Sequence, residues 1–163
     1  MSDFLEGRLD GATRLAVLGV GSELRSDDIA GLLVADRLER SFRGREDVFV
    51  CKGCSAPENL TGPILRFKPS HLVIVDCAEI DGLPGAVGLF PVENIGGLTS
   101  NTHSLPLSVI FGYLNHGRSF EILVVGIQPS CLDFDGKASK EVMGAVRIVS
   151  TALTRAARAM GKR

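Results

Sequence analysis

Apolar residues along this chain gather in short continuous runs that alternate with longer amphipathic stretches. The runs are typical of strands buried on both faces of a parallel sheet, and the stretches repeat apolar positions every three or four residues, as helices do. Strands are predicted at 14–20, 48–51, 71–77, 82–91 and 121–127. Because 82–91 begins with Gly and Pro, we expect it to be an edge strand, and its direction stays open.

The amphipathic stretches predict four helices. The first begins at Ile29 and ends near 42–44, the second is irregular and spans 58–67, the third begins after Ser104 and stops at Gly117, and the last spans 139–160. The alternation predicts an α/β fold, a three-layer sandwich in which a mostly parallel sheet of about five strands is flanked by helices. We expect residues 1–163 to form a single domain, with the polar, Gly-rich stretch 1–13 loosely ordered.

Composition and charge limit the kinds of partner and the cellular location that we expect. The formal net charge of −1 gives no reason to expect nucleic acid or an anionic membrane surface. No apolar run approaches the roughly 20 residues of a membrane span. The N-terminal stretch contains acidic residues and no apolar core, so it does not resemble a signal peptide. A cytoplasmic location is the expectation, and a monomer is our expectation for the assembly.

The four cysteines have several explanations. Cys51 and Cys54 form a CxxC, which can be a redox pair, half of a zinc site or a coincidence of spacing. A zinc site needs a second pair at similar spacing, and the other cysteines, Cys77 and Cys131, do not provide one. Reduced thiols near strand ends are the favoured interpretation, with a disulfide or redox role as the alternative.

The stretch 15–31, LAVLGVGSELRSDDIAG, carries one carboxylate more than its structure requires. Asp27 and Asp28 stand together before the first helix, where a single Asp would suffice to cap the free amides and face the positive end of the helix dipole. The second carboxylate lies close to the carboxyl end of a strand, which is where open α/β sheets usually bind ligands.

Three residues with metal-ligand chemistry follow separate elements of the predicted sheet. Asp28 lies just past the first strand, Asp76 ends the third, and His103 precedes a helix. Two carboxylates and an imidazole suit a borderline divalent ion such as Ni²⁺ or Zn²⁺. Each also has a structural explanation, as a helix cap, a strand-end acceptor of amide hydrogen bonds, and a surface loop residue respectively.

The remaining histidines and loop carboxylates are interpreted as structural or peripheral. His71 opens a strand, and His116 lies in a last helical turn, where partial positive charge is favoured. Asp133 and Asp135 flank an aromatic residue in a loop, where they either border the same crevice or are solvated turn residues.

Two other chemistries fit the sequence less well. Dinucleotide binding at GVGSEL needs a third Gly where Leu24 stands and an acidic residue at the end of the second strand, where Lys52 stands instead. Nucleophilic catalysis by Cys54 or Cys77 with His103 as base is conceivable, but no flanking signature supports it. No Ser lies in a G-x-S-x-G elbow.

Several segments together resemble the hydrogenase maturation endopeptidases. These are GSELRSDDIAG, GCSAPEN, the strand ending IVDC, NTHSLPL and VVGIQP, in this order between residue 15 and about residue 130. SAPEN, THSLPL and GIQP resemble more narrowly the branch that processes the hydrogenase 3, formate-hydrogenlyase type. In the family Asn is common where this chain has Ser22, Gly is frequent where it has Ile29, and Gly stands where it has Cys54.

The resemblance implies a function and a set of site residues. Members of the family remove a C-terminal extension from the large-subunit precursor of a [NiFe]-hydrogenase after nickel has been inserted. The family's nickel-recognising and catalytic positions fall on Asp28, Asp76 and His103. Nickel would therefore arrive with the precursor as part of the substrate, and Asp27 would be left for local capping or support.

The resemblance leaves the mechanism open. The nickel either polarises the scissile carbonyl or activates water, or else it only positions the peptide while Asp27, Asp28 or another carboxylate acts as general base. Two alternatives of another class also remain, a non-catalytic metallochaperone or docking factor for the same subunit, and a nucleotide-binding domain.

Overall fold

A twisted five-stranded sheet forms the middle layer of the protein. The computed structural model describes residues 2–54, 56–91, 120–134 and 136–160, and the structural statements below concern these residues. The strand order is β2-β1-β3-β5-β4. The strands are β1 (Leu15–Val20), β2 (Val48–Gly53), β3 (His71–Cys77), β4 (Val87–Pro91) and β5 (Glu121–Ile127).

The strands run as the apolar patterns indicate. β1, β3 and β5 are buried along nearly their whole length and pair in parallel, as does β2 with β1. β4 pairs antiparallel with β5 at the edge of the sheet, which resolves the direction left open by the sequence. The prediction of a mostly parallel sheet of five strands is confirmed.

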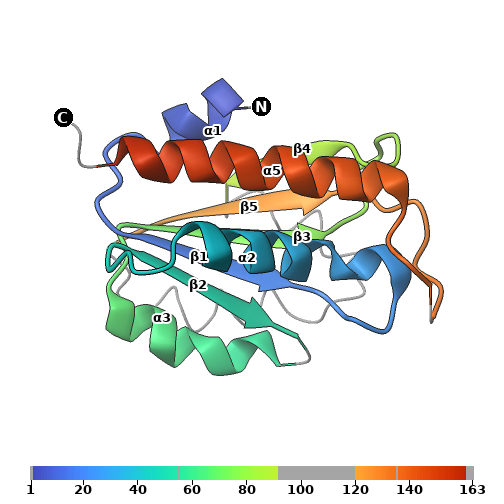
Figure 1. Ribbon diagram of the computed structural model, residues 1–163, viewed down its shortest axis with the longest axis horizontal. Helices are drawn as coiled ribbons and strands as arrows, with labels where there is room; N and C mark the ends of the chain where they lie inside the picture. The colour runs from blue at the N-terminus through green and yellow to red at the C-terminus, as the bar shows by residue number, and fades with distance from the viewer. Residues whose placement is uncertain (1, 55, 92–119, 135, 161–163) are drawn as a thin grey trace.

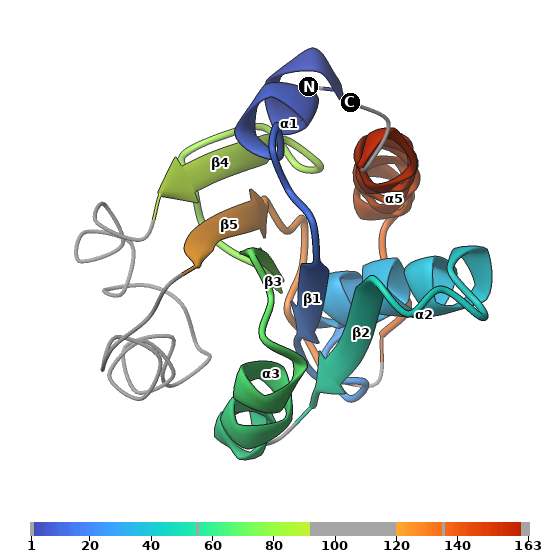
Figure 2. The ribbon, with the colours of Figure 1, turned by 90° about the vertical axis from the view of Figure 1, so that its left-hand side faces the viewer.

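Helices cover both faces of the sheet (Figures 1 and 2). On one face α2 (Ala30–Ser41) and α5 (Lys140–Ala159) pack against β1, β3 and β5, and on the other lie the 3-10 turn η2 (Pro57–Leu60) and α3 (Thr61–Phe67). Each face of the sheet forms its own apolar cluster with the helices that cover it, because alternate residues of each strand point to opposite faces. No helix within the described ranges is long and apolar enough to cross a bilayer.

The N-terminal stretch differs from the prediction. Instead of being loosely ordered, it contains α1 (Ser2–Arg8), which packs against α5. Leu5 is fully buried, and Leu9 and Ala12 are almost so. Their four- and three-residue spacing is the helical signal that the polar composition of the stretch obscured.

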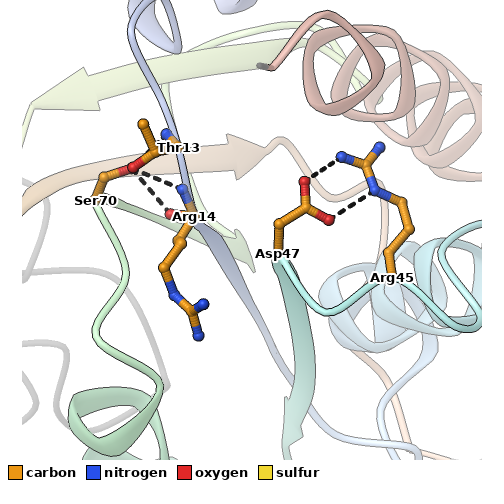
Figure 3. A network of polar contacts seen from close by, with 5 residues as sticks. All are labelled: Thr13, Arg14, Arg45, Asp47 and Ser70. Atoms are coloured by element: carbon orange, nitrogen blue, oxygen red, sulfur yellow. Dashed lines mark hydrogen bonds and ion pairs between the residues drawn. The ribbon is translucent and has the colours of Figure 1, made fainter.

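Polar contacts join the amino ends of three strands (Figure 3). The Ser70 hydroxyl oxygen accepts hydrogen bonds from the backbone N–H groups of Thr13 and Arg14, at 2.9 and 3.1 Å, and its own proton is donated to the Arg14 carbonyl. The Arg45 guanidinium pairs with Asp47, whose carbonyl accepts from the Leu15 N–H. These contacts fix the entry to β1, β2 and β3 at the edge opposite to the candidate site.

The carboxyl edge contains the point where the sheet changes its direction of winding. From β1 the chain crosses to β2 on one side, and it then returns past β1 to form β3 on the other. Such a switch point opens a crevice between the connections that follow the two strands, here β1 and β3.

Candidate active site

Two glycines bring α2 unusually close to the carboxyl ends of β1 and β3. A Cβ on Gly31, in the first turn of α2, would overlap the carbonyl oxygens of Val20 and Val75. A Cβ on Gly19 would overlap the Gly31 carbonyl oxygen and lie 2.9 Å from the Ala35 methyl. The start of α2 is therefore seated directly on the switch point, and the loop before it has little room to move.

The loop from Gly21 to Asp28 closes on itself and fixes the backbone of Asp28. The Ser22 N–H donates to the Asp28 carbonyl at 3.2 Å, and the Asp28 N–H donates to the Arg25 carbonyl at 2.7 Å. Gly21 has φ +149°, and a Cβ there would overlap the same Asp28 carbonyl oxygen. Only glycine fits this position, because a side chain would push the two ends of the loop apart.

Asp76 reaches the same edge from β3. Its side chain is fully buried, and one carboxylate oxygen accepts the N–H of Cys77 at 2.8 Å. The 3-10 turn η1 (Ser26–Ile29), which carries the half-buried Asp28, packs against β3. The prediction that Asp28 and Asp76 lie at one edge of a parallel sheet therefore agrees with the topology.

This edge is electronegative, as its effect on Cys77 indicates. The pKa of the Cys77 thiol is raised by burial and then by the negative charges of Asp76, Asp28 and Asp27. A thiol that keeps its proton at neutral pH is a poor nucleophile, so catalysis by Cys77 is contradicted. The same field attracts a cation to the crevice.

Asp27 supports its turn through contacts with a distant segment and does not cap the following helix. Neither η1 nor α2 is capped by a side chain, so Asp27 does not cap the helix that follows it. Its fully buried carboxylate instead accepts four hydrogen bonds from Ser130, Cys131 and Ser139. Both carboxylate oxygens are engaged with protein donors and closed to solvent, an arrangement that favours a structural role over that of a general base. The expectation of a supporting role agrees with these contacts.

The four cysteines are free thiols in the structure. None of Cys51, Cys54, Cys77 and Cys131 is in a disulfide. Burial, followed by the charge of Glu39, raises the pKa of Cys51 to about 12, and its thiol donates to the Val17 carbonyl. A redox CxxC needs a lowered thiol pKa, so Cys51 lacks the property that such a motif requires.

Phosphate binding at the glycine loop is also disfavoured. The Asp27 and Asp28 N–H groups, which a phosphate cradle would present to its ligand, donate to the carbonyls of Cys131 and Arg25. Lys52, which stands where the dinucleotide fingerprint needs an acidic residue, pairs with Asp36 at 2.7 Å. The groups that a dinucleotide would use are thus engaged within the protein.

Several predicted residues lie elsewhere or outside the described residues. His71 opens β3 at the amino edge, away from Asp76, where the Ser70 hydroxyl lies 3.1 Å from its Nδ1, and this agrees with a structural role. Asp133 lies on the loop that packs against η1 and accepts the Cys131 thiol proton at 3.0 Å. His103, His116 and Asp135 fall outside the described residues, and so does the predicted helix between Ser104 and Gly117.

The described residues alone do not complete a metal site. Within them, no group of three or more His, Cys, Asp or Glu side chains is placed to hold an ion. Asp28 and Asp76 contribute two oxygen donors to the edge, and the predicted third ligand, His103, belongs to the part of the chain not described. The donor chemistry of the two carboxylates is compatible with a divalent cation.

The fold is that of an α/β protein with two carboxylates at the carboxyl edge of its sheet, beside the topological switch point, and comparison with known proteins identifies the family. The model of the HycI hydrogenase maturation protease family matches residues 32–156. A Methanocaldococcus jannaschii protein assigned to the hydrogenase maturation proteases is 30% identical over 157 residues, covering 93% of each chain. The hydrogenase 3 maturation protease of Escherichia coli is 30% identical over 134 residues, covering 82% of this chain and 84% of its own.

Comparison with solved structures leads to the same family. The crystal structure of the [NiFe] hydrogenase maturation protease HycI from Thermococcus kodakarensis superposes with a TM-score of 0.86 at 27% identity, covering 95% of this chain and 99% of that one. The chain belongs to the hydrogenase maturation protease family, and it is accordingly a peptide hydrolase. The resemblance inferred from its motifs is confirmed at the level of the family.

The partners of Asp27 are the site feature that sequence reasoning missed. Ser130 and Ser139 gave no motif, and they follow Asp27 by 103 and 112 residues. The nearest signal was the surplus carboxylate itself, which indicated that one of the pair had a partner beyond its own helix.

Proposed function

We propose that this protein removes the C-terminal extension of a [NiFe]-hydrogenase large-subunit precursor once nickel has been inserted. In this proposal Asp28, Asp76 and His103 recognise the nickel that the precursor carries. The observation that supports it most directly is that η1, which carries Asp28, packs against β3, which carries Asp76 at the carboxyl edge of the sheet. The electronegative edge and the membership of the family support it.

The chemistry of the three donors explains how cleavage would wait for metal insertion. Two carboxylates and an imidazole bind a borderline divalent ion with moderate strength and leave other positions to ligands of the precursor. A precursor without nickel offers these donors no cation, so its extension is held less well. Binding of the metal would thus orient the peptide in the crevice, and orientation alone contributes several kcal/mol to such reactions.

Incubation with purified precursor tests the proposal. The precursor is prepared with and without nickel, and the mass of its C-terminal end is followed by mass spectrometry. We expect the nickel-loaded form to lose its extension and the nickel-free form to stay intact. An unchanged mass of the loaded precursor, together with stable binding to it, would instead identify a docking factor or metallochaperone.

Three variants test the residues that we propose to recognise nickel. Asp28→Asn, Asp76→Asn and His103→Ala should each abolish processing, while the far-ultraviolet circular dichroism of His103→Ala stays that of the wild type. Glu79→Gln is the matched control, because Glu79 is exposed and also acts on the Cys77 pKa, yet it is not one of the proposed ligands. Undiminished cleavage by His103→Ala would remove His103 from the site.

The precursor type is a finer part of the proposal. The segments SAPEN, THSLPL and GIQP favour a hydrogenase 3-type large subunit, and the Escherichia coli relative with that name supports it. This assignment is tested by offering hydrogenase 3-type and hydrogenase 2-type precursors at equal concentration and measuring which is cleaved faster. Preferred cleavage of the hydrogenase 2 type would refute the narrower assignment and leave the family activity in place.

A further inference from the structure

The Asp27 carboxylate joins the turn that carries Asp28 to a segment more than a hundred residues later. One oxygen accepts the Ser139 N–H at 2.6 Å. The other accepts the N–H groups of Ser130 and Cys131, at 2.8 and 3.0 Å, and the Ser139 hydroxyl at 3.0 Å. In return the Asp27 N–H donates to the Cys131 carbonyl at 3.2 Å. We call this set of contacts the Asp27 clamp.

Neighbouring residues of the same turn reinforce the clamp. The Ser26 hydroxyl donates to the Asp133 carbonyl at 2.8 Å, and the Arg25 Nε–H donates to the Leu132 carbonyl at 3.3 Å. Arg25 also forms an isolated antiparallel bridge with Phe134. Contacts from three consecutive residues thus hold the turn from one side, while η1 packs against β3 on the other.

The clamp also reaches the start of α5. Ser139 is the N-cap of that helix, and its hydroxyl oxygen accepts the Val142 N–H at 3.3 Å while its proton is donated to Asp27. Asp27 therefore orients the cap of a 20-residue helix that packs on α2. The position of η1 is set by α5, the longest helix among the described residues, as well as by its own short loop.

A carboxylate is required here, because both of its oxygens face backbone N–H groups. An amide at this position would direct its NH₂ group toward the Ser139 N–H in one orientation and toward Ser130 and Cys131 in the other. Two donors would then face each other in a site closed to solvent, which leaves both without a partner. Asn is therefore almost identical to Asp27 in size but opposite to it in hydrogen-bonding function.

We propose that Asp27 is a positioning residue for hydrolysis, in that its clamp holds the neighbouring Asp28 in the orientation that engages the substrate. This inference rests on the proposed function, since it assigns Asp28 to the site. A residue that orients a metal-binding group typically affects activity by about 10- to 100-fold when it is changed. In the proposed site Asp76 and His103 would still hold the nickel, so a misplaced Asp28 would lower the turnover of bound precursor more than its affinity.

Asp27→Asn is the principal test, with Ser70→Ala as matched control. Ser70 likewise accepts two backbone N–H groups with its side chain, but at the amino edge of the sheet. Both variants are assayed under conditions in which urea titration shows them to be folded. We expect kcat per folded molecule to fall about 10- to 100-fold in Asp27→Asn with KM little changed, and both constants to be unchanged in Ser70→Ala.

Two further variants serve if Asp27→Asn does not fold. Ser139→Ala removes one of the four donors and should lower kcat to an intermediate extent. Ser139→Thr keeps the hydroxyl and should retain the wild-type value. Equal kcat values for Ser139→Ala, Ser139→Thr and the wild type would overturn the proposal.

Amide hydrogen exchange separates this inference from the proposed function. The Ser22 and Asp28 amides report on the loop at the site, and the Leu15 amide, which donates to Asp47, reports on the opposite edge. In Asp27→Asn, or in Ser139→Ala if it replaces that variant, exchange should accelerate at Ser22 and Asp28 more than at Leu15. Equal acceleration at all three would indicate a general loss of stability and refute the clamp. If the wild type does not cleave the precursor, the proposed function fails. The exchange data then test by themselves whether the clamp fixes the loop that carries Asp28.

Discussion

Replacing Gly31 by alanine should test how tightly the candidate site is seated on the sheet. The added methyl group would overlap two backbone carbonyl oxygens, of Val20 and of Val75, and neither can rotate away. Relief requires the start of α2 to move by about 1 Å, to the distance of a normal contact. That movement would also displace Asp28, which lies three residues before Gly31.

Two opposing effects set the change in the free energy of unfolding caused by Gly31→Ala. Alanine favours a helix over glycine by at most about 1 kcal/mol. Overpacking in a well-packed interior costs about 1–3 kcal/mol, and the upper end applies where rigid backbone atoms are met. The net loss is then about 2 kcal/mol, which for a urea m-value of about 2 kcal/mol/M lowers the unfolding midpoint by about 1 M.

Gly144→Ala is the control for the helix propensity. Gly144 lies inside α5, and the nearest atom to an added Cβ is a guanidinium nitrogen of Arg147 at 3.9 Å. This variant should raise the urea midpoint by up to about 0.5 M, because alanine gains helix propensity without a clash. If Gly31→Ala were as stable as the wild type, the close packing of α2 on β1 and β3 would be wrong.

Three further outcomes can be measured on the purified protein. Leu5→Ala should lower the free energy of unfolding by about 2–5 kcal/mol, and a loss below about 0.5 kcal/mol in a urea titration would contradict a docked α1. Burial lowers the pKa of His71 below 6.5, so the unfolded state takes up its proton first and stability should fall as the pH drops through that value. His71→Gln should flatten this dependence of stability on pH, measured by urea titrations at several pH values. An unchanged slope would refute the role of His71 in it. Iodoacetamide near pH 8 should label the exposed Cys54 and spare Cys51, whose pKa is about 12, as peptide masses would reveal.

The strands were predictable because burial on both faces leaves a clear trace in the sequence. The run at 71–77 became β3 with the bounds predicted, and 121–127 became β5 in the same way. Asp76 was correctly placed near the carboxyl end of a strand, although it is fully buried and the strand continues to Cys77. The class of fold and the positions of Asp28 and Asp76 at the carboxyl edge follow from such local signals.

Contacts between distant segments were not predictable in this way. Hydrophobic periodicity reports which face of an element is buried but not which element covers it, so the order β2-β1-β3-β5-β4 had to come from the structure. The role of Asp27 depends on N–H groups far along the chain, and backbone groups leave no mark in a sequence. α1 was missed because its polar residues outweighed a short apolar stripe around Leu5.

The position of the Asp27 clamp has a consequence for when the site forms. β1, η1 and β3 lie in the first half of the chain, yet the donors that hold Asp27 come from residues 130–139 and from the cap of α5. Without that segment Asp27 would face water and η1 would lose the contacts that hold it from one side, so we expect the turn to be fixed only once the C-terminal segment has docked. The orientation that we propose for Asp28 would therefore be a property of the completed fold, and a partly folded chain would carry the loop without it.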